Sequence, residues 1–299
     1  MSIHPEPARS DRVIGAATQV GTEVSINFGS SLAGLTVPVV GAFLVVAVRQ
    51  LVMVLVVLPF YRPHRSELTW RALWPAIALG VVLAVMNLSF YESVHLLGLG
   101  VAATIEFLGP LALALAMSRR LLDAVCALAA ALGVFLLTGF DGTTNLWGVL
   151  LALTAAAAWA AYIVLTRQVA LKLPGLHGLT VASVVSLVLL LPPTLVTLQW
   201  SALDTRILLL LLSIGVLSSA LPYSLDTFIL RRITPRLYAI ITSFGPVVAA
   251  VFGWLVLGEQ FSTIEVIAIA VVCVSAGTAI ATQRERAKTD LELTAETIP

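Results

Sequence analysis

Three ionisable side chains lie within long apolar stretches of the sequence. Glu106 falls in the run from about Leu96 to Met117, and Glu23 and Arg49 lie midway along the first and second such stretches. A charged group at the centre of a bilayer costs roughly 2.5 kcal/mol or more, so such groups usually face a protein interior or a water-filled cavity. A carboxylate in that setting can bind an ammonium group or carry a proton. These residues therefore indicate a polar site inside a membrane.

Glu106 also begins the sequence Glu106-Phe107-Leu108-Gly109-Pro110, which is expected to interrupt a helix. Pro110 has no N–H to donate to the carbonyl of Glu106, four residues earlier. The carboxylate and the freed carbonyl are then expected at one kinked point. The sequence Ser243-Phe244-Gly245-Pro246 repeats the pattern in the second half of the chain without the acid. Breaks at Pro110 and Pro246 predict a duplicated architecture with an asymmetric centre.

The composition is that of an integral membrane protein. Hydrophobic residues make up 59% of the 299-residue chain and charged residues only 11%, whereas about 25% of a typical soluble domain is charged. The apolar segments are about 18 to 23 residues long, which is the length of membrane-spanning helices rather than of barrel strands. The lipid bilayer is therefore the expected surroundings. A net charge of +1 without a long basic block argues against nucleic acid as a partner.

The sequence does not favour an enzyme. None of the four histidines lies deep in an apolar segment, so neither a metal site nor a Ser-His pair is expected. A glycine-rich phosphate loop is absent, so we expect no nucleotide site and no bound cofactor. Cys126 and Cys273 lie in separate apolar segments and are expected to be buried packing residues rather than a disulfide.

Ten apolar segments bounded by charged residues, proline or glycine predict an all-α fold with ten transmembrane helices. They lie at about residues 13–33, 38–60, 71–92, 95–117, 121–139, 146–165, 177–198, 207–229, 234–257 and 262–282. With both termini in the cytoplasm, fifteen of the 17 Lys and Arg residues lie on the inner side, Arg206 lies outside and Arg49 lies within the membrane. Because basic residues prefer cytoplasmic loops, we expect a multi-pass protein of the cell (inner) membrane with both termini cytoplasmic.

Two halves of five spans each must have opposite orientations, because five is odd. That is the inverted-repeat plan of many secondary transporters, with a central cavity between the repeats. The spacing between Pro110 and Pro246, applied to the first span, also places Glu23 opposite Trp159. The predicted divisions are a cytoplasmic tail at 1–12, a first repeat at 13–139, a periplasmic or extracellular linker at 140–145, a second repeat at 146–282 and a cytoplasmic tail without regular structure at 283–299.

Helical spacing groups further polar side chains onto single faces, because residues three or four apart project together. Arg49 is expected to pair with Glu23 or Glu106, which leaves the other acid to take a proton or an ammonium group. A pair that only locks helices together, and tyrosines that only anchor the membrane interface, remain alternatives. Glu259, in the turn before the last span, is expected to cap a helix end or to face solvent. The candidate substrate- or proton-binding residues are Glu106, Arg49, Glu23, Asn27, Asn87, Tyr91, Trp159, Tyr162 and Tyr223.

Motifs at these positions resemble those of the EamA-type drug/metabolite transporter superfamily, and most closely its threonine and homoserine exporter branch. The resemblance covers about residues 15–282 and implies a ten-helix inverted-repeat fold and efflux of amino acids or related small metabolites in exchange for protons. Two positions differ from the branch. This chain has Gly245 where such exporters often have an acid, and it has Glu23 in the first span, where an acid is not a feature of the branch. The motifs are Arg49, Asn87-Leu88-Ser89-Phe90-Tyr91, Glu106-Phe107-Leu108-Gly109-Pro110, Trp159-Ala160-Ala161-Tyr162-Ile163, Ala220-Leu221-Pro222-Tyr223-Ser224-Leu225 and Gly258-Glu259.

Two classes of function stay open at this point. In the first, the chain exports a small zwitterionic metabolite by proton exchange, with Arg49 attracting its carboxylate and Glu106 or Glu23 taking its ammonium group or a proton. In the second, the chain is an uncoupled facilitator, an exporter of another small metabolite or drug, or a membrane scaffold. The second class requires only that the carboxylates of Glu23 and Glu106 have partners within the protein.

Overall fold

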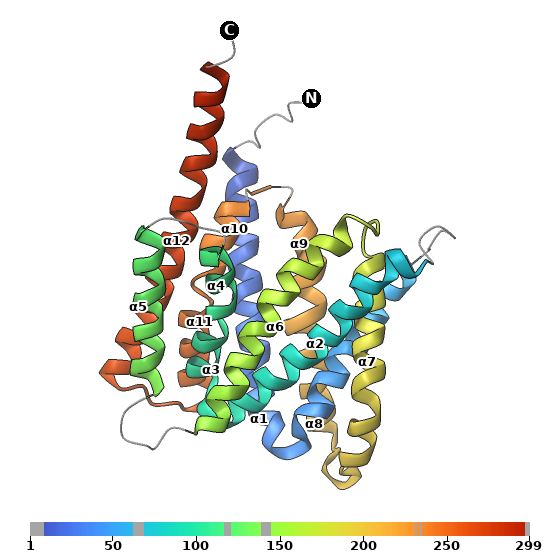
Figure 1. Ribbon diagram of the computed structural model, residues 1–299. Helices are drawn as coiled ribbons and strands as arrows, with labels where there is room; N and C mark the ends of the chain where they lie inside the picture. The colour runs from blue at the N-terminus through green and yellow to red at the C-terminus, as the bar shows by residue number, and fades with distance from the viewer. Residues whose placement is uncertain are drawn as a thin grey trace.

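The structure is a computed structural model that describes residues 9–61, 69–116, 121–138, 145–230, 232–233 and 235–296. These residues form helices joined by loops, with no β-strand among them (Figure 1). The predicted all-α fold is confirmed for this part of the chain. Predictions for residues 1–8, the loop at 62–68, Arg119, Arg120, most of the linker at 140–145 and Arg231 concern residues outside the described ranges.

The helices follow the chain in two sets. The first half contains α1 (Arg9–Val57), α2 (Trp70–Leu97), α3 (Leu99–Glu106), α4 (Leu108–Ala116) and α5 (Leu121–Thr138). The second half contains α6 (Leu146–Ala170), α7 (His177–Thr197), α8 (Thr205–Gly215), α9 (Leu221–Leu230), α10 (Pro235–Thr242), α11 (Gly245–Phe252) and α12 (Thr263–Glu296). Two π-helical turns follow α8 and α11, at Val216–Ala220 and Gly253–Leu257, and short 3-10 turns lie at Leu58–Phe60 and Trp200–Ala202.

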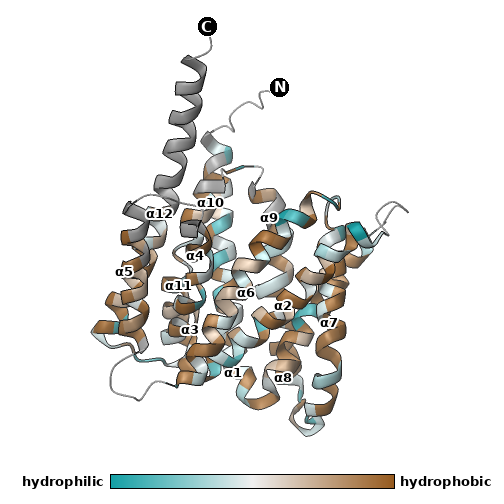
Figure 2. Ribbon diagram, viewed as in Figure 1, coloured by the Kyte–Doolittle hydropathy of each residue, from teal (hydrophilic) through white to brown (hydrophobic). Residues whose placement is uncertain are grey.

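Six of the described helices are long and apolar enough to cross a membrane, namely Val13–Phe60, Trp70–Leu97, Leu146–Ala170, His177–Thr197, Thr205–Leu225 and Leu237–Leu257. Shorter apolar helices lie at Leu99–Leu113, Leu128–Leu137 and Thr263–Ala279. Many apolar side chains are exposed, such as Leu128, Val188 and Val274. Figure 2 shows that hydrophobic residues predominate along the helices. Exposed apolar side chains in such numbers are suited to lipid rather than water, so the chain is a multi-pass membrane protein.

The bend in α1 lies at Gly41, not in the predicted gap between residues 33 and 38. Gly41 has φ 80° and ψ 155°, a conformation that glycine adopts without the steric penalty of a Cβ atom. Pro38 lies inside the helix before the bend. A proline costs that helix one hydrogen bond, whereas the positive φ at Gly41 redirects the chain. The predicted boundary between the first two spans was therefore wrong by several residues.

The last helix is longer than predicted. We expected residues 283–299 to lack regular structure, but α12 continues to Glu296. The segment from Gln283 to Glu296 is rich in Ala, Arg, Glu, Lys and Leu, which have high helix propensity. Because these residues extend a helix that already exists, they need no new nucleus.

The start of α1 and the end of α12 lie at the same end of the helical bundle, which we call the termini end (Figure 1). The bend in α1, the start of α3 and the start of α12 lie at the other end, which we call the opposite end (Figure 1). Helices α1, α2, α6, α7 and α8 pack side by side, and α3 packs on both α6 and α11. Short helices that begin or end inside the bundle are thus surrounded by long ones.

Both predicted break regions interrupt a helix. Helix α3 ends at Glu106, Phe107 forms a turn and α4 begins at Leu108, so that Pro110 lies in the first turn of α4. Helix α10 ends at Thr242, and α11 begins at Gly245 with Pro246 in its first turn. The first turn is where a proline is best tolerated, since its missing N–H would have no helical partner there. Glu106 and Thr242 are consequently the last residues of two half-length helices.

Gly109 allows α4 to lie against α6 at this break. A Cβ atom at Gly109 would lie 2.0 Å from the carbonyl oxygen of Ala156 on α6. Small residues let membrane helices approach closely, and here only glycine fits. This contact fixes the break, and with it Glu106, relative to α6.

Candidate functional site

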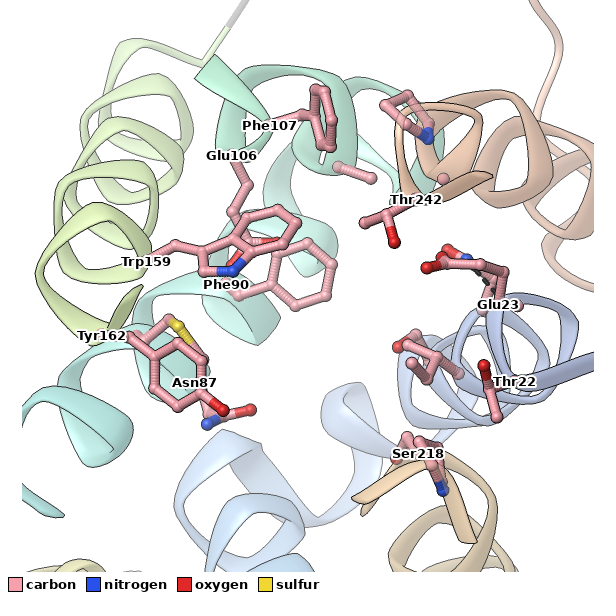
Figure 3. Close-up of a pocket in the computed structure, with 18 of the residues that line it drawn as sticks. Thr22, Glu23, Asn87, Phe90, Glu106, Phe107, Trp159, Tyr162, Ser218 and Thr242 are labelled. Atoms are coloured by element: carbon pink, nitrogen blue, oxygen red, sulfur yellow. Dashed lines mark hydrogen bonds between the residues drawn. The ribbon is translucent and has the colours of Figure 1, made fainter. Parts of the chain in front are cut away.

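The nine candidate residues all line one cavity of about 220 Å³ near the centre of the bundle. Its walls come from α1, α2, α3, α6, α9, α10, α11 and the first π-helical turn. Figure 3 shows Glu106 and Trp159 on one side of the opening and Glu23 and Thr242 facing them on the other. Pro246 also lines the cavity, and Pro110 does not. The cavity lining is Thr22, Glu23, Ile26, Asn27, Ser30, Arg49, Met86, Asn87, Phe90, Tyr91, Ala103, Glu106, Phe107, Trp159, Tyr162, Ser218, Pro222, Tyr223, Tyr238, Thr242, Gly245 and Pro246.

Arg49 hydrogen-bonds to neutral groups rather than to an acid. Its Nε donates to the Ser219 hydroxyl at 3.0 Å, its Nη1 donates to Asn87 Oδ1, and its Nη2 donates to the Ser218 carbonyl at 2.8 Å. The predicted direct pair with Glu23 or Glu106 is therefore wrong. The physical reason is that these three acceptors already match the fork of the guanidinium, whose donors have fixed directions.

The local sequence explains why the Ser218 carbonyl is available to Arg49. Pro222 lies four residues after Ser218 and has no N–H for the usual helical hydrogen bond. The surrounding backbone is a π-helical turn, a feature that is frequent at functional sites. Arg49 satisfies the carbonyl, so the guanidinium ties α1 to the junction between α8 and α9.

Asn87 and Tyr91 support Arg49 from α2, one turn apart. The Asn87 Nδ2 donates to the Leu83 carbonyl at 2.8 Å, which leaves its Oδ1 turned toward Arg49. The Arg49 guanidinium carbon lies 5.1 Å from the centre of the Tyr91 ring, a cation–π distance. The Tyr91 hydroxyl lies 3.4 Å from the Ser30 hydroxyl on α1. The buried Asn87 side chain thus has two hydrogen-bond partners, the Leu83 carbonyl and Arg49.

Glu23 belongs to a polar network on α1. Gln19 Nε2 donates to Glu23 Oε1 and to the Thr242 hydroxyl, both at 3.1 Å. Asn27 Nδ2 donates to the Glu23 carbonyl at 2.9 Å. Glu23 Oε2 lies 3.5 Å from the position that a Cβ atom would have at Gly245. Glu23 is therefore held in place where α1 meets the break between α10 and α11.

Glu106 has a different environment. Its side chain extends into the cavity from the end of α3 (Figure 3). Within the described ranges, its carboxylate neither accepts a hydrogen bond nor forms an ion pair. A half-buried carboxylate that faces a cavity with its acceptor positions unused can bind a cationic group or a proton.

Aromatic side chains form the wall around Glu106. Trp159 and Phe107 pack edge to face with ring centres 5.7 Å apart, and the rings of Phe90 and Tyr91 are 5.3 Å apart in a similar arrangement. These rings give the cavity an apolar wall beside the Glu106 carboxylate. The arrangement suits a small solute with a cationic group and an apolar body.

Sequence reasoning missed several lining residues. The spacing between Pro110 and Pro246 also separates Glu106 from Thr242, so the repeat could have identified Thr242. Ser30 lies three residues after Asn27 and continues its polar face. Other lining residues gave no such signal, because apolar or hydroxyl residues are common in membrane helices wherever they face. These are Phe90, Ser218 and Tyr238.

The described residues contain no group of three His, Cys, Asp or Glu side chains placed to hold a metal ion. Cys126 and Cys273 are both buried and do not form a disulfide, as predicted.

Comparison with known proteins identifies the family of the chain and agrees with the fold. Residues 146–281 match the model of the EamA-like transporter family. The threonine/homoserine exporter RhtA of Salmonella typhimurium strain LT2 is 37% identical over 265 residues, which are 87% of this chain and 90% of that protein. The protein of the same name from Escherichia coli strain K12 is 34% identical over 273 residues, 90% and 92% of the two chains.

One solved crystal structure has the same fold at low sequence identity. It covers 93% of this chain and 99% of its own, with a TM-score of 0.60 and 18% identity. Because identity to the two relatives exceeds 30% over most of both chains, the relationship extends beyond the segment matched by the family model. The chain belongs to the EamA-like transporter family.

Proposed function

We propose that this transporter exports small zwitterionic amino acids, with threonine and homoserine as the leading substrates, in exchange for protons. The observation that carries the proposal is the Glu106 carboxylate, which faces a cavity without a hydrogen bond from the described residues. A proton and a substrate ammonium group would compete for this carboxylate. Such competition is the linkage that coupled exchange requires.

Arg49 provides the complementary charge for the substrate carboxylate. A guanidinium has five N–H donors, and three hydrogen bonds account for three of them. The two that remain are enough for a carboxylate that enters the cavity. In this proposal the substrate pocket is shaped by Glu23, Asn27 and Tyr223, while the Glu106 carboxylate binds either a proton or the substrate ammonium group.

The size of the cavity supports a small substrate. Its 220 Å³ is below the range of roughly 300 to 1,000 Å³ that is typical of sites for drug-sized ligands. The names of the two relatives, threonine/homoserine exporter RhtA, favour an amino acid within that size. An exporter of a large drug is the less suitable alternative.

We further propose ten membrane crossings in two inverted repeats, at residues 13–139 and 146–282. Counting the bent helix Val13–Phe60 as two crossings and the three shorter apolar helices as one each supports that number. The spacing between the two prolines pairs Glu106 with Thr242, each of which ends a half-length helix beside the cavity. We propose that the termini end is cytoplasmic and that the protein lies in the cell (inner) membrane, because the start of α2 and the end of α6, which carry Arg71 and Arg167, lie at that end.

The test uses purified protein in proteoliposomes. Threonine and homoserine should move faster when an opposing proton gradient is imposed than when it is collapsed. Analogues without the ammonium group or without the carboxylate should compete at least tenfold less well. Flux that is the same with and without the gradient would instead identify a facilitator. If no amino acid is transported at all, the alternative that remains is a membrane scaffold.

A further inference from the structure

Glu259 connects the two halves of the chain at the opposite end. It follows the second π-helical turn, and its two carboxylate oxygens accept hydrogen bonds from the backbone N–H groups of Leu99 and Gly100, the latter at 3.2 Å. These are the first two residues of α3, 160 and 159 positions earlier in the chain. The expectation that Glu259 caps a helix end is confirmed. The capped helix belongs to the other half of the chain.

The surrounding glycines form a slot for this carboxylate. A Cβ atom at Gly253 would lie 2.2 Å from Glu259 Oε2, and one at Gly98 would lie 2.9 Å from Oε1. Gly98 has φ 85°, which fits a residue without a side chain just before α3. The free N–H groups and positive end of a helix attract a carboxylate. The slot thus holds Glu259 in one position.

Other contacts between the two halves lie nearby. The ring centres of Phe28 on α1 and Phe252 on α11 are 5.5 Å apart. A Cβ atom at Gly34 would lie 2.9 Å from a methyl group of Leu257. Together with the packing of α3 on α11, these contacts join the two halves of the chain near Glu259.

Helix α3 links this closure to the substrate site. It has eight residues, so its ends are about 12 Å apart at the usual rise per residue. Leu99, at one end, is held by Glu259, and Glu106, at the other end, faces the cavity. Any movement of the capped end therefore moves Glu106 as well.

We propose that Glu259 is a latch that holds the outer gate of the transporter closed and positions Glu106 through α3. This rests on the proposed export function and topology, which make the opposite end the outer face. Release of substrate to the outside requires α3 and α1 to separate from α11 and the loop that carries Glu259. The two hydrogen bonds of the latch are broken in that step and re-formed when the gate closes.

Both oxygens of the Glu259 carboxylate serve the latch as acceptors. Burial raises the pKa of the Glu259 carboxyl above its ordinary value, although the two N–H donors act in the other direction and nearby Glu265 adds to the increase. Glu259→Gln keeps one acceptor and the shape, whereas Glu259→Ala leaves both N–H groups without a partner.

The test measures how easily the cavity is reached from outside. Cys126 and Cys273 are replaced by alanine, and Ala103, which lines the cavity, is replaced by cysteine as a reporter. A membrane-impermeant maleimide is then added to intact cells. Glu259→Ala should raise the labelling rate at least fivefold, and Glu259→Gln, which keeps one of the two acceptors, should raise it by less.

Glu265→Ala is the matched control. Glu265 also accepts a backbone N–H, from Ser262 at 2.7 Å, but that contact caps α12 within one half of the chain. Its removal should leave the labelling rate unchanged. Gly253→Ala gives an independent test, because its methyl group displaces the Glu259 carboxylate without removing it, and it should act like Glu259→Ala.

Equal labelling of Glu259→Ala, Gly253→Ala and Glu265→Ala would overturn the latch. Amino-acid export is measured on the same set of proteins without the Ala103→Cys change. Normal export in the parent with equal labelling of the variants would reject the latch alone. If the parent exports no amino acid but Glu259→Ala and Gly253→Ala are still labelled faster, the latch is supported and the proposed substrate is rejected.

Discussion

Arg49 and Glu106 line the same cavity but have opposite kinds of surroundings. Arg49 donates to three acceptors, whereas no described group donates to the Glu106 carboxylate. The sequence predicted that both residues face a cavity, because an ionisable group in an apolar span is costly elsewhere. It could not predict the partners of Arg49, since these depend on the backbone near Pro222 and not on helical spacing.

The hydrogen bonds of Arg49 lead to the first prediction. Arg49→Lys keeps the positive charge, but an ammonium group cannot reach three acceptors in the directions of a guanidinium. Each buried acceptor left without a donor costs about 1 to 3 kcal/mol. The melting temperature in detergent should therefore fall by several degrees. Arg206→Lys, near the exposed start of α8, should melt like the parent, and a parent-like melt for Arg49→Lys would show that its bonds contribute little.

At the scale of the elements, sequence patterns predicted helices better than their ends. The apolar segments and the interruptions near Pro110 and Pro246 could be read directly, because proline removes a defined hydrogen bond. The bend at Gly41 and the π-helical turns could not, since they depend on how neighbouring helices pack.

The close contact between α4 and α6 leads to the second prediction. Gly109→Ala places a methyl group against the Ala156 carbonyl and should destabilise the protein by about 1 to 3 kcal/mol, the usual cost of overpacking. Gly21 in α1 has no atom within 4 Å of its Cβ position, so Gly21→Ala should be neutral or slightly stabilising. Thermal unfolding of the two variants side by side makes the comparison. If they unfold alike, Gly109 does not set the distance between α4 and α6.

At the scale of the molecule, the duplicated pattern explains why one cavity forms between the two halves. Glu106 and Thr242 end equivalent half-length helices, and the paired positions Glu23 and Trp159 face each other across the opening (Figure 3). The spacing between Pro110 and Pro246 in the sequence is enough to predict this pairing. The tilt of the helices, which sets the volume of the cavity, is not encoded in any short motif.

The proposed orientation leads to the third prediction. A cysteine at Trp200, between α7 and α8, should react with an impermeant thiol reagent in intact cells, because that loop lies at the opposite end. A cysteine at Lys172, between α6 and α7, should react only after the membrane is opened. The reverse pattern would mean that the termini face outward.

The central claim is that proton exchange depends on the Glu106 carboxylate. Glu106→Gln keeps the shape of the side chain but removes its charge and its titration. In proteoliposomes it should insert into the membrane and melt like the parent, while gradient-driven amino-acid flux falls at least a hundredfold. Glu92→Gln is the control, since Glu92 lies on the same half of the chain but lines a separate hollow beside the Gly41 bend. It should transport normally. Undiminished, pH-dependent flux in Glu106→Gln would contradict the account.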